Sequence, residues 1–248
     1  MIMDRSRKAV IYAVIYTMIM AIGMFSSYHI FGYSYDSPKI DRILIWFELV
    51  MSIFAILIYI RSRNGKAFGR LKITPTFLIY SLLMISGALS YIIKGCYRDS
   101  SPNYSHIFIT TLFVAFSEEM MYRGIVLGAF LEKHSRLKAI MLSSMMFSLL
   151  HTVNMLGGVS FSSMMIQLAN TFIFGLVLSS FMVRNGNIIP LMIYHFIWDM
   201  VLISPSFMEN ASWMIASTVT LSIILAIALP IAIGKEDRKK GLMQIQGM

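Results

Sequence analysis

The chain has 248 residues, of which 57% are apolar and 13% are charged, whereas roughly a quarter of the residues of a soluble domain are charged. The apolar residues come in long blocks, so the composition excludes an ordinary soluble domain and predicts a polytopic membrane protein. A net charge of +9 would suggest nucleic-acid binding in a soluble protein. Here the basic residues lie between apolar blocks, as they do in membrane proteins, and we expect no nucleic-acid partner.

Eight apolar blocks have about the length that a helix needs to cross a lipid bilayer, which is roughly 20 residues. In chain order they cover residues 9–31, 42–60, 74–93, 106–131, 139–155, 162–183, 188–204 and 212–233. Between them we find no tandem repeat, low-complexity linker or soluble appendage. The sequence therefore predicts an all-α fold, a polytopic membrane bundle of about eight helices that forms one domain over residues 1–248.

The basic residues between these blocks are unevenly distributed. Most of the 21 Lys and Arg residues lie at the N-terminal end, in the loops after the second, fourth and sixth blocks, and in the C-terminal tail. The alternate loops contain Lys39, Arg42, Lys94 and Arg98. Because basic loops stay in the cytoplasm, we expect an integral membrane protein with cytoplasmic N- and C-termini.

The block 106–131 contains Glu118, Glu119 and Arg123 near its middle. A charged side chain at the centre of a membrane helix costs about 2.5 kcal/mol or more, so three of them indicate a function. Glu119 and Arg123 are four residues apart on one helical face and are expected to pair. Glu118 lies off that line and is left for chemistry. The alternative is an ion-paired polar patch that holds the bundle together.

Other apolar blocks contain Glu48, His151, His195 and Asp199. We interpret Glu48 as a hydrogen-bonding group that faces the bundle, and a lone buried histidine such as His151 is often a satisfied polar group. His195 and Asp199 share a helical face, where the carboxylate can orient the imidazole or simply form a helix-internal hydrogen bond. Together with Glu118, these groups can activate a water molecule and stabilise an oxyanion.

Three motifs follow one another in the second half of the chain. They are Glu118-Glu119-Met-Met-Tyr-Arg123, Phe147-Ser-Leu-Leu-His151 and His195-Phe-Ile-Trp-Asp199. They resemble the Glu-Glu-x-x-x-Arg, Phe-x-x-x-His and His-x-x-x-Asn/Asp motifs of the CPBP family, also called the Abi family. That family comprises membrane-embedded CAAX-processing enzymes and bacterial bacteriocin-processing or self-immunity proteins. The family-like core covers about residues 105–204, and the first three blocks resemble the family only in being apolar.

This resemblance implies a helical bundle with a cavity that admits a peptide. Glu118 and His151 would position and deprotonate the attacking water, and His195 with residue 199 would stabilise the tetrahedral oxyanion. Arg123, paired with Glu119, would hold the first motif in shape.

Residue 199 and the cofactor both affect the chemistry that the resemblance implies. CAAX-type enzymes have Asn where this chain has Asp199, and an ionised carboxylate has no hydrogen to donate. Asp199 must therefore be protonated or must act by orienting His195. No cofactor is certain. Zinc is possible, and Glu118, His151 and His195 would then hold it.

The three motifs differ in their expected depth in the membrane. From the helical rise per residue, His151 is placed near the outer end of its block and His195 near the inner end. The helices must tilt, break or begin elsewhere for these groups to meet.

We expect an intramembrane endopeptidase of the CPBP type in a bacterial plasma membrane. It would cut a peptide or protein near the membrane surface, in CAAX-like processing, bacteriocin-related processing or self-immunity. One alternative is a non-catalytic membrane immunity or scaffold protein that uses the polar cluster for structure. Another is a small transporter that carries protons on Glu118 and Glu119.

Overall fold

A computed structural model describes residues 4–62, 67–93, 104–203 and 212–246, and nearly all of these residues are helical. The elements are α1 (Arg5–Phe25), η1 (Ser26–Ile30), α2 (Asp41–Ser62), α3 (Pro75–Ile93), α4 (Tyr104–Glu119), η4 (Met120–Val126), α5 (Leu127–Leu131), α6 (Arg136–Leu150), η5 (His151–Gly157), α7 (Phe161–Asn185), α8 (Ile189–Ile203) and α10 (Ser212–Gln246). The described residues form no strand, apart from one isolated β-bridge between Phe68 and Asn187. The predicted all-α fold is confirmed.

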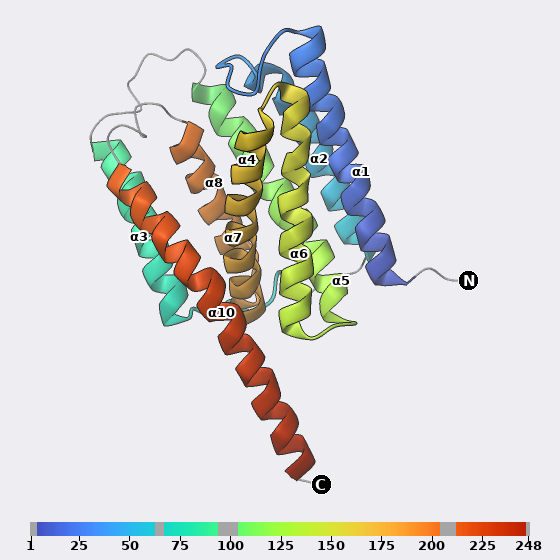
Figure 1. Cartoon of the computed structure of the whole chain (residues 1–248), viewed down its shortest axis with the longest axis vertical. Helices are drawn as coiled ribbons and strands as arrows, with labels where there is room; N and C mark the ends of the chain where they lie inside the picture. Colours follow the sequence, from blue (N-terminus) through green and yellow to red (C-terminus); the bar gives the residue numbers. More distant parts are fainter. Residues whose placement is uncertain (1–3, 63–66, 94–103, 204–211, 247–248) are drawn as a thin grey trace.

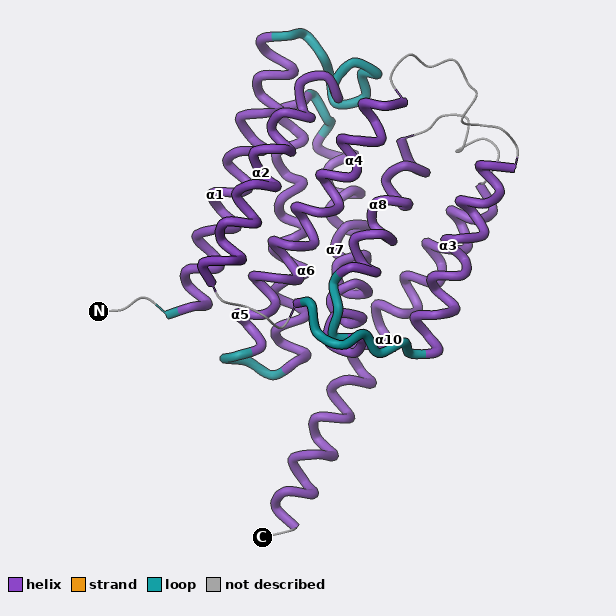
Figure 2. The backbone as a smooth tube through the Cα atoms, turned by 180° about the vertical axis from the view of Figure 1, so that it is seen from behind, coloured by secondary structure: helices purple, strands orange, loops and turns teal. Residues whose placement is uncertain are grey.

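The helices form one bundle with their connections at its two ends (Figures 1 and 2). In the described part of the chain, five helices are long and apolar enough to cross a membrane, and two apolar helices are shorter. The five are Arg5–Ile30, Asp41–Ser62, Arg136–Gly157, Phe161–Asn185 and Trp213–Lys239, and the shorter two are Pro75–Ser86 and Ile189–Ile203. Large apolar side chains such as Met18, Leu57 and Ile79 are exposed along the outer faces, as expected for contact with lipid. The chain is thus an integral membrane protein.

The predicted block 106–131 forms one continuous rod made of α4, η4 and α5, which lies in the middle of the bundle. It packs against α1, α2, α6 and α8, and Met121, Tyr122 and Leu127 are fully buried in it. The rod is not uniform, because Met120–Val126 winds as a π-helix directly after Glu119. Such wide turns inside α-helices often occur at functional sites.

Two other elements differ from the predicted blocks. α6 gives way to the 3-10 helix η5 at His151, whereas a regular helix is predicted to residue 155. The last helix is predicted to end at residue 233 but continues to Gln246. Two ion pairs fix the start of this extension, because Arg136 donates to Asp237 at 2.6 Å and Arg184 donates to Glu236 at 2.7 Å.

α6 and α7 are antiparallel neighbours in close contact. Small residues allow this approach, as they do in many membrane bundles. A Cβ atom added at Gly175 of α7 would lie 3.0 Å from the Cβ of Ser144 on α6. The Ser144 and Ser179 hydroxyl oxygens are 3.5 Å apart across the same interface. This contact fixes the helix that carries Phe147 and His151.

Candidate active site

A cavity of about 1050 Å³ lies between α2, α4, α6, α7, α8 and α10. Its ionisable wall residues are Asp36, Asp41, Glu48, Glu118, His151, His195 and Asp199. Apolar side chains such as Leu44, Ile166 and Trp198 complete the wall. The cavity reaches the end of the bundle where the chain turns from α1 into α2, and both termini lie toward the opposite end (Figure 1).

Glu119 joins the first and third motifs beneath this cavity. Its Oε1 accepts a hydrogen bond from Arg123 Nη1 at 2.7 Å and lies 2.9 Å from His195 Nδ1. The Glu119 side chain is fully buried and Arg123 nearly so. The predicted Glu119–Arg123 pair is confirmed, and the contact with His195 adds a partner that helical spacing does not predict. The Arg123 guanidinium also lies 4.2 Å from the centre of the Phe147 ring, close enough for a cation–π interaction.

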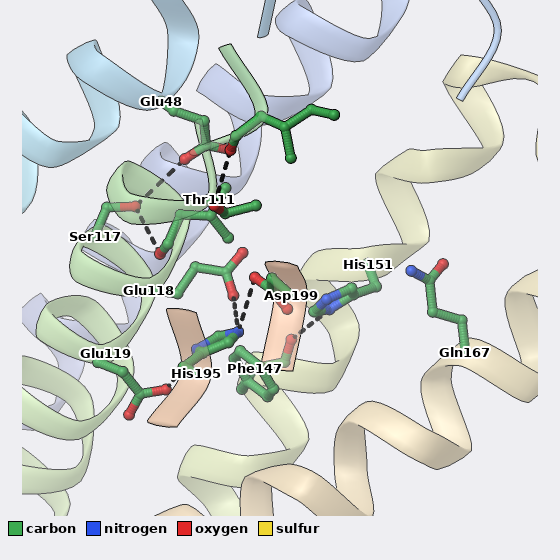
Figure 3. Close-up of polar contacts among 12 residues, drawn as sticks. Glu48, Thr111, Ser117, Glu118, Glu119, Phe147, His151, Gln167, His195 and Asp199 are labelled. Atoms are coloured by element: carbon green, nitrogen blue, oxygen red, sulfur yellow. Dashed lines mark hydrogen bonds and ion pairs between the residues drawn. The ribbon is translucent and has the colours of Figure 1, made fainter. Parts of the chain in front are cut away.

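Glu118 points into the cavity beside His195 (Figure 3). Glu118 Oε2 is 3.8 Å from His195 Nε2, and Asp199 Oδ2 is 3.5 Å from the same nitrogen. The predicted proximity of His195 and Asp199 is therefore confirmed. Within the described residues, Glu118 Oε2 is buried and has no hydrogen-bond partner, and its charged neighbour is His195.

His151 lines the same cavity at the point where α6 changes into η5. Its Nδ1 lies 3.2 Å from the carbonyl oxygen of Phe147. No hydrogen bond or ion pair joins His151 to Glu118 in the described part of the chain. The Phe147 ring packs between the two imidazoles, 5.3 Å from His151 and 6.0 Å from His195 between ring centres. His151 and His195 are predicted to lie at different depths in the membrane. The change of helix at His151 places both imidazoles beside the same Phe147 ring.

Glu48 is a further carboxylate in the cavity wall. It is fully buried, and its Oε2 accepts a hydrogen bond from Ser117 Oγ at 3.4 Å. The Tyr16 hydroxyl lies 2.7 Å from the same Ser117 oxygen. The interpretation of Glu48 as a bundle-facing hydrogen-bonding group is confirmed, but its place in the cavity is new. A charge within an apolar block is the sequence signal for Glu48, whereas no signal points to Tyr16 or Ser117.

Polar side chains also lie where the cavity nears the end of the bundle. Gln167 accepts a hydrogen bond from the Asn154 amide at 3.0 Å and donates one to the Tyr35 hydroxyl at 3.2 Å. Burial raises the pKa of Tyr35, so this hydroxyl stays neutral at physiological pH. These three side chains form a neutral hydrogen-bonded chain in the cavity wall.

A bound zinc ion needs three or four suitable side chains around one point. In the described ranges, no three His, Cys, Asp or Glu side chains form a group that could hold a metal ion. Glu118, His151 and His195 are the residues that would hold zinc, and their arrangement here does not fit a shared ion.

Comparisons with known proteins agree with the motifs. Residues 100–201 match the family model described as type II CAAX prenyl endopeptidase Rce1-like. This segment contains all three motifs and nearly coincides with the predicted core of about residues 105–204. The chain has no match among curated proteins. The family match confirms the resemblance of residues 100–201 to the CPBP/CAAX protease family.

Proposed function

We propose that the protein is an intramembrane endopeptidase in which a glutamate and two histidines hydrolyse a peptide bond without a metal. One observation carries this proposal: Glu118, His151 and His195, from three separate helical segments, line one cavity. The cavity volume of about 1050 Å³ is at the upper end of the usual range for sites that hold small ligands. It is therefore large enough for several residues of an extended peptide.

In the proposed mechanism, Glu118 accepts a proton from the attacking water. Its Oε2 faces the cavity without a protein hydrogen-bond partner among the described residues. His151 would orient the same water through its Nε2, because its Nδ1 faces the Phe147 carbonyl. The water oxygen attacks the substrate carbonyl carbon, and the proton then passes to the leaving amine as the C–N bond breaks.

His195 would stabilise the negative charge that forms on the carbonyl oxygen. A doubly protonated imidazole donates through both nitrogens, and Nδ1 of His195 already has Glu119 as its acceptor at 2.9 Å. Nε2 then remains for the oxyanion, with Asp199 at 3.5 Å orienting the ring. This assignment lets residue 199 be a carboxylate, because Asp199 need not donate a hydrogen bond. A fixed donor at such a position typically contributes about 10²–10³-fold to the rate.

We propose that the whole chain acts as one domain, although the family match covers residues 100–201. Two contacts between the first two helices and the matched segment support a single domain. The Ser117 side chain lies within hydrogen-bonding distance of Tyr16 on α1 and Glu48 on α2, so the first two helices shape the wall directly beside Glu118.

We also propose that both termini lie in the cytoplasm of a bacterial cell. The loops and tail on the side of the termini contain most of the basic residues, which favours a cytoplasmic location for that side. The cavity reaches the opposite end of the bundle. A peptide would then approach from outside the plasma membrane, which suits a role in bacteriocin-related processing or self-immunity.

The test is cleavage of a peptide library by the purified protein in detergent, with products identified by mass spectrometry. The wild type and the Glu132→Gln control, altered at the opposite end of the bundle, should cut the same bonds. Glu118→Gln should cut none, while its thermal unfolding should match that of the wild type. Cleavage should persist with a metal chelator present.

Three results would overturn the proposal. Equal cleavage by Glu118→Gln would remove the glutamate from the chemistry. Loss of cleavage with chelator, restored by zinc, would show a metalloprotease. A wild type that cuts no peptide and is merely destabilised by Glu118→Gln would indicate the non-catalytic scaffold instead.

A further inference from the structure

Glu48 is a buried carboxylate with few hydrogen-bond partners. Its side chain is fully buried, and within the described residues its Oε1 has no hydrogen-bond partner. The Ser117 hydroxyl reaches only the other oxygen, at 3.4 Å. A buried carboxylate is strongly disfavoured unless a cation or several hydrogen-bond donors face it.

In the described part of the chain, no Lys, Arg or His side chain forms a hydrogen bond or ion pair with Glu48. The cavity wall contains five carboxylates, two histidines and neither Lys nor Arg. Arg123 is part of the first motif, and its charge is already paired with Glu119. Lys39 and Arg42 lie near the same end of the bundle as the cavity, but both are exposed and neither belongs to its wall.

The carboxylates are arranged along the cavity rather than in one spot. Asp36 and Asp41 lie where the chain turns into α2, Glu48 lies two helical turns further along α2, and Glu118 follows on α4. In the close-up, Glu48 lies above Glu118, with Ser117 and Thr111 at the level between them (Figure 3). A wall in which carboxylates outnumber cationic side chains attracts positive charge and guides it inward.

The hydrogen bond from Ser117 relates the position of Glu48 to that of Glu118. Ser117 directly precedes Glu118 in the chain and donates to Glu48. Glu48 therefore contacts the residue that precedes Glu118, and both carboxylates belong to the wall of one cavity. A group bound to Glu48 must belong to a substrate residue beside the bond that is cut, rather than to a distant part of the peptide.

We propose that Glu48 is a specificity-determining residue that binds the cationic side chain of a lysine or arginine next to the scissile bond. The substrate class is accordingly a basic peptide. This inference rests on the proposed endopeptidase function. It goes beyond that function in assigning the charge that the cavity selects and the residue that selects it.

The experiment compares pairs of otherwise identical peptides with lysine or norleucine beside the cut bond. For the wild type, kcat/KM should be about tenfold or more higher for lysine, the effect expected of one charge-assisted hydrogen bond. Glu48→Gln keeps the size of the side chain and an acceptor for Ser117 but removes the charge. Its preference for lysine should fall to nearly one, because the loss of activity should be much larger for the lysine peptide than for the norleucine peptide. The Glu132→Gln control should keep the full preference.

A second readout separates this inference from the proposed function. Fluorescent lysine and norleucine peptides are bound to Glu118→Gln and to Glu118→Gln with Glu48→Gln, neither of which is expected to cut. Tighter binding of lysine in the first protein and its loss in the second support the subsite even if no cleavage is found. A wild type without preference for lysine, or a Glu48→Gln variant that retains it, would overturn the proposal. So would an equal loss of activity toward both peptides, because that result indicates a structural role.

Discussion

At the scale of single residues, the site depends on one oxygen atom of Glu119. That oxygen contacts both Arg123 and His195 in a region closed to solvent. The arginine balances the glutamate charge, and the glutamate fixes the orientation of the imidazole. Removing either partner leaves a buried charge without compensation.

We expect Arg123→Ala to lower the free energy of unfolding by about 3–5 kcal/mol, because it leaves the Glu119 carboxylate buried and unpaired. Arg184→Ala is the matched control, since Arg184 pairs with Glu236 at the surface and such pairs contribute about 1 kcal/mol or less. Thermal unfolding in detergent measures both. Equal, small shifts for the two variants would show that the buried pair does not stabilise the bundle.

The sequence predicts the contacts within one helix and misses those between helices. Glu119–Arg123 and His195–Asp199 are each four residues apart, so helical geometry alone places them together. The contacts of His195 with Glu119 and of Glu48 with Ser117 depend on how separate helices pack. Residue spacing contains no information on that packing, which is why the role of Glu48 in the cavity could not be predicted.

At the scale of elements, the apolar blocks predict where the helices lie but not how each one is wound. The π-helical turn over Met120–Val126 and the change to a 3-10 helix at His151 both occur beside motif residues. Hydrophobic blocks define the length of a helix, whereas such local changes are set by tertiary packing. The extension of α10 past residue 233 is likewise fixed by ion pairs with Arg136 and Arg184.

We expect Gly175→Val to destabilise the α6–α7 contact by about 1–3 kcal/mol, because the added atoms meet Ser144 at 3.0 Å. It should also lower cleavage, since α6 carries Phe147 and continues into η5, which begins at His151. Gly234→Val is the control with the same change in a helix, where the nearest atom, from Leu137, is 3.7 Å away. Unfolding temperatures and cleavage rates of both variants are compared with the wild type. If the Gly234 variant proves the less stable of the two, the close approach of α6 and α7 does not matter.

At the scale of the whole molecule, charge and shape give the bundle two different ends. Basic residues and both termini lie toward one end, and the cavity reaches the other (Figure 1). The predicted fold class follows from composition and block length, and the structure confirms it. The orientation in the membrane stays a prediction from the loop charges.

Orientation is tested by labelling intact cells with a membrane-impermeant maleimide in a Cys96→Ser background. We expect Lys39→Cys to be labelled, because it lies at the cavity end, and Lys133→Cys to be labelled only after the cells are broken. Both lysines are exposed in the structure. A difference in labelling between the two variants would therefore reflect the side of the membrane and not burial within the protein. The reverse pattern would place the cavity toward the cytoplasm and make a cytoplasmic peptide the substrate.

The central claim is that Glu118 and His195 act together on one substrate bond. A double-mutant cycle measures this most directly, with kcat/KM for one peptide determined in the wild type, Glu118→Gln, His195→Ala and the double variant. We expect each single variant to lose about 10²–10⁴-fold, and the double variant to lose no more than the worse single one, as for residues that work as a unit. Losses that multiply in the double variant, or full activity in either single variant, would contradict a shared catalytic site.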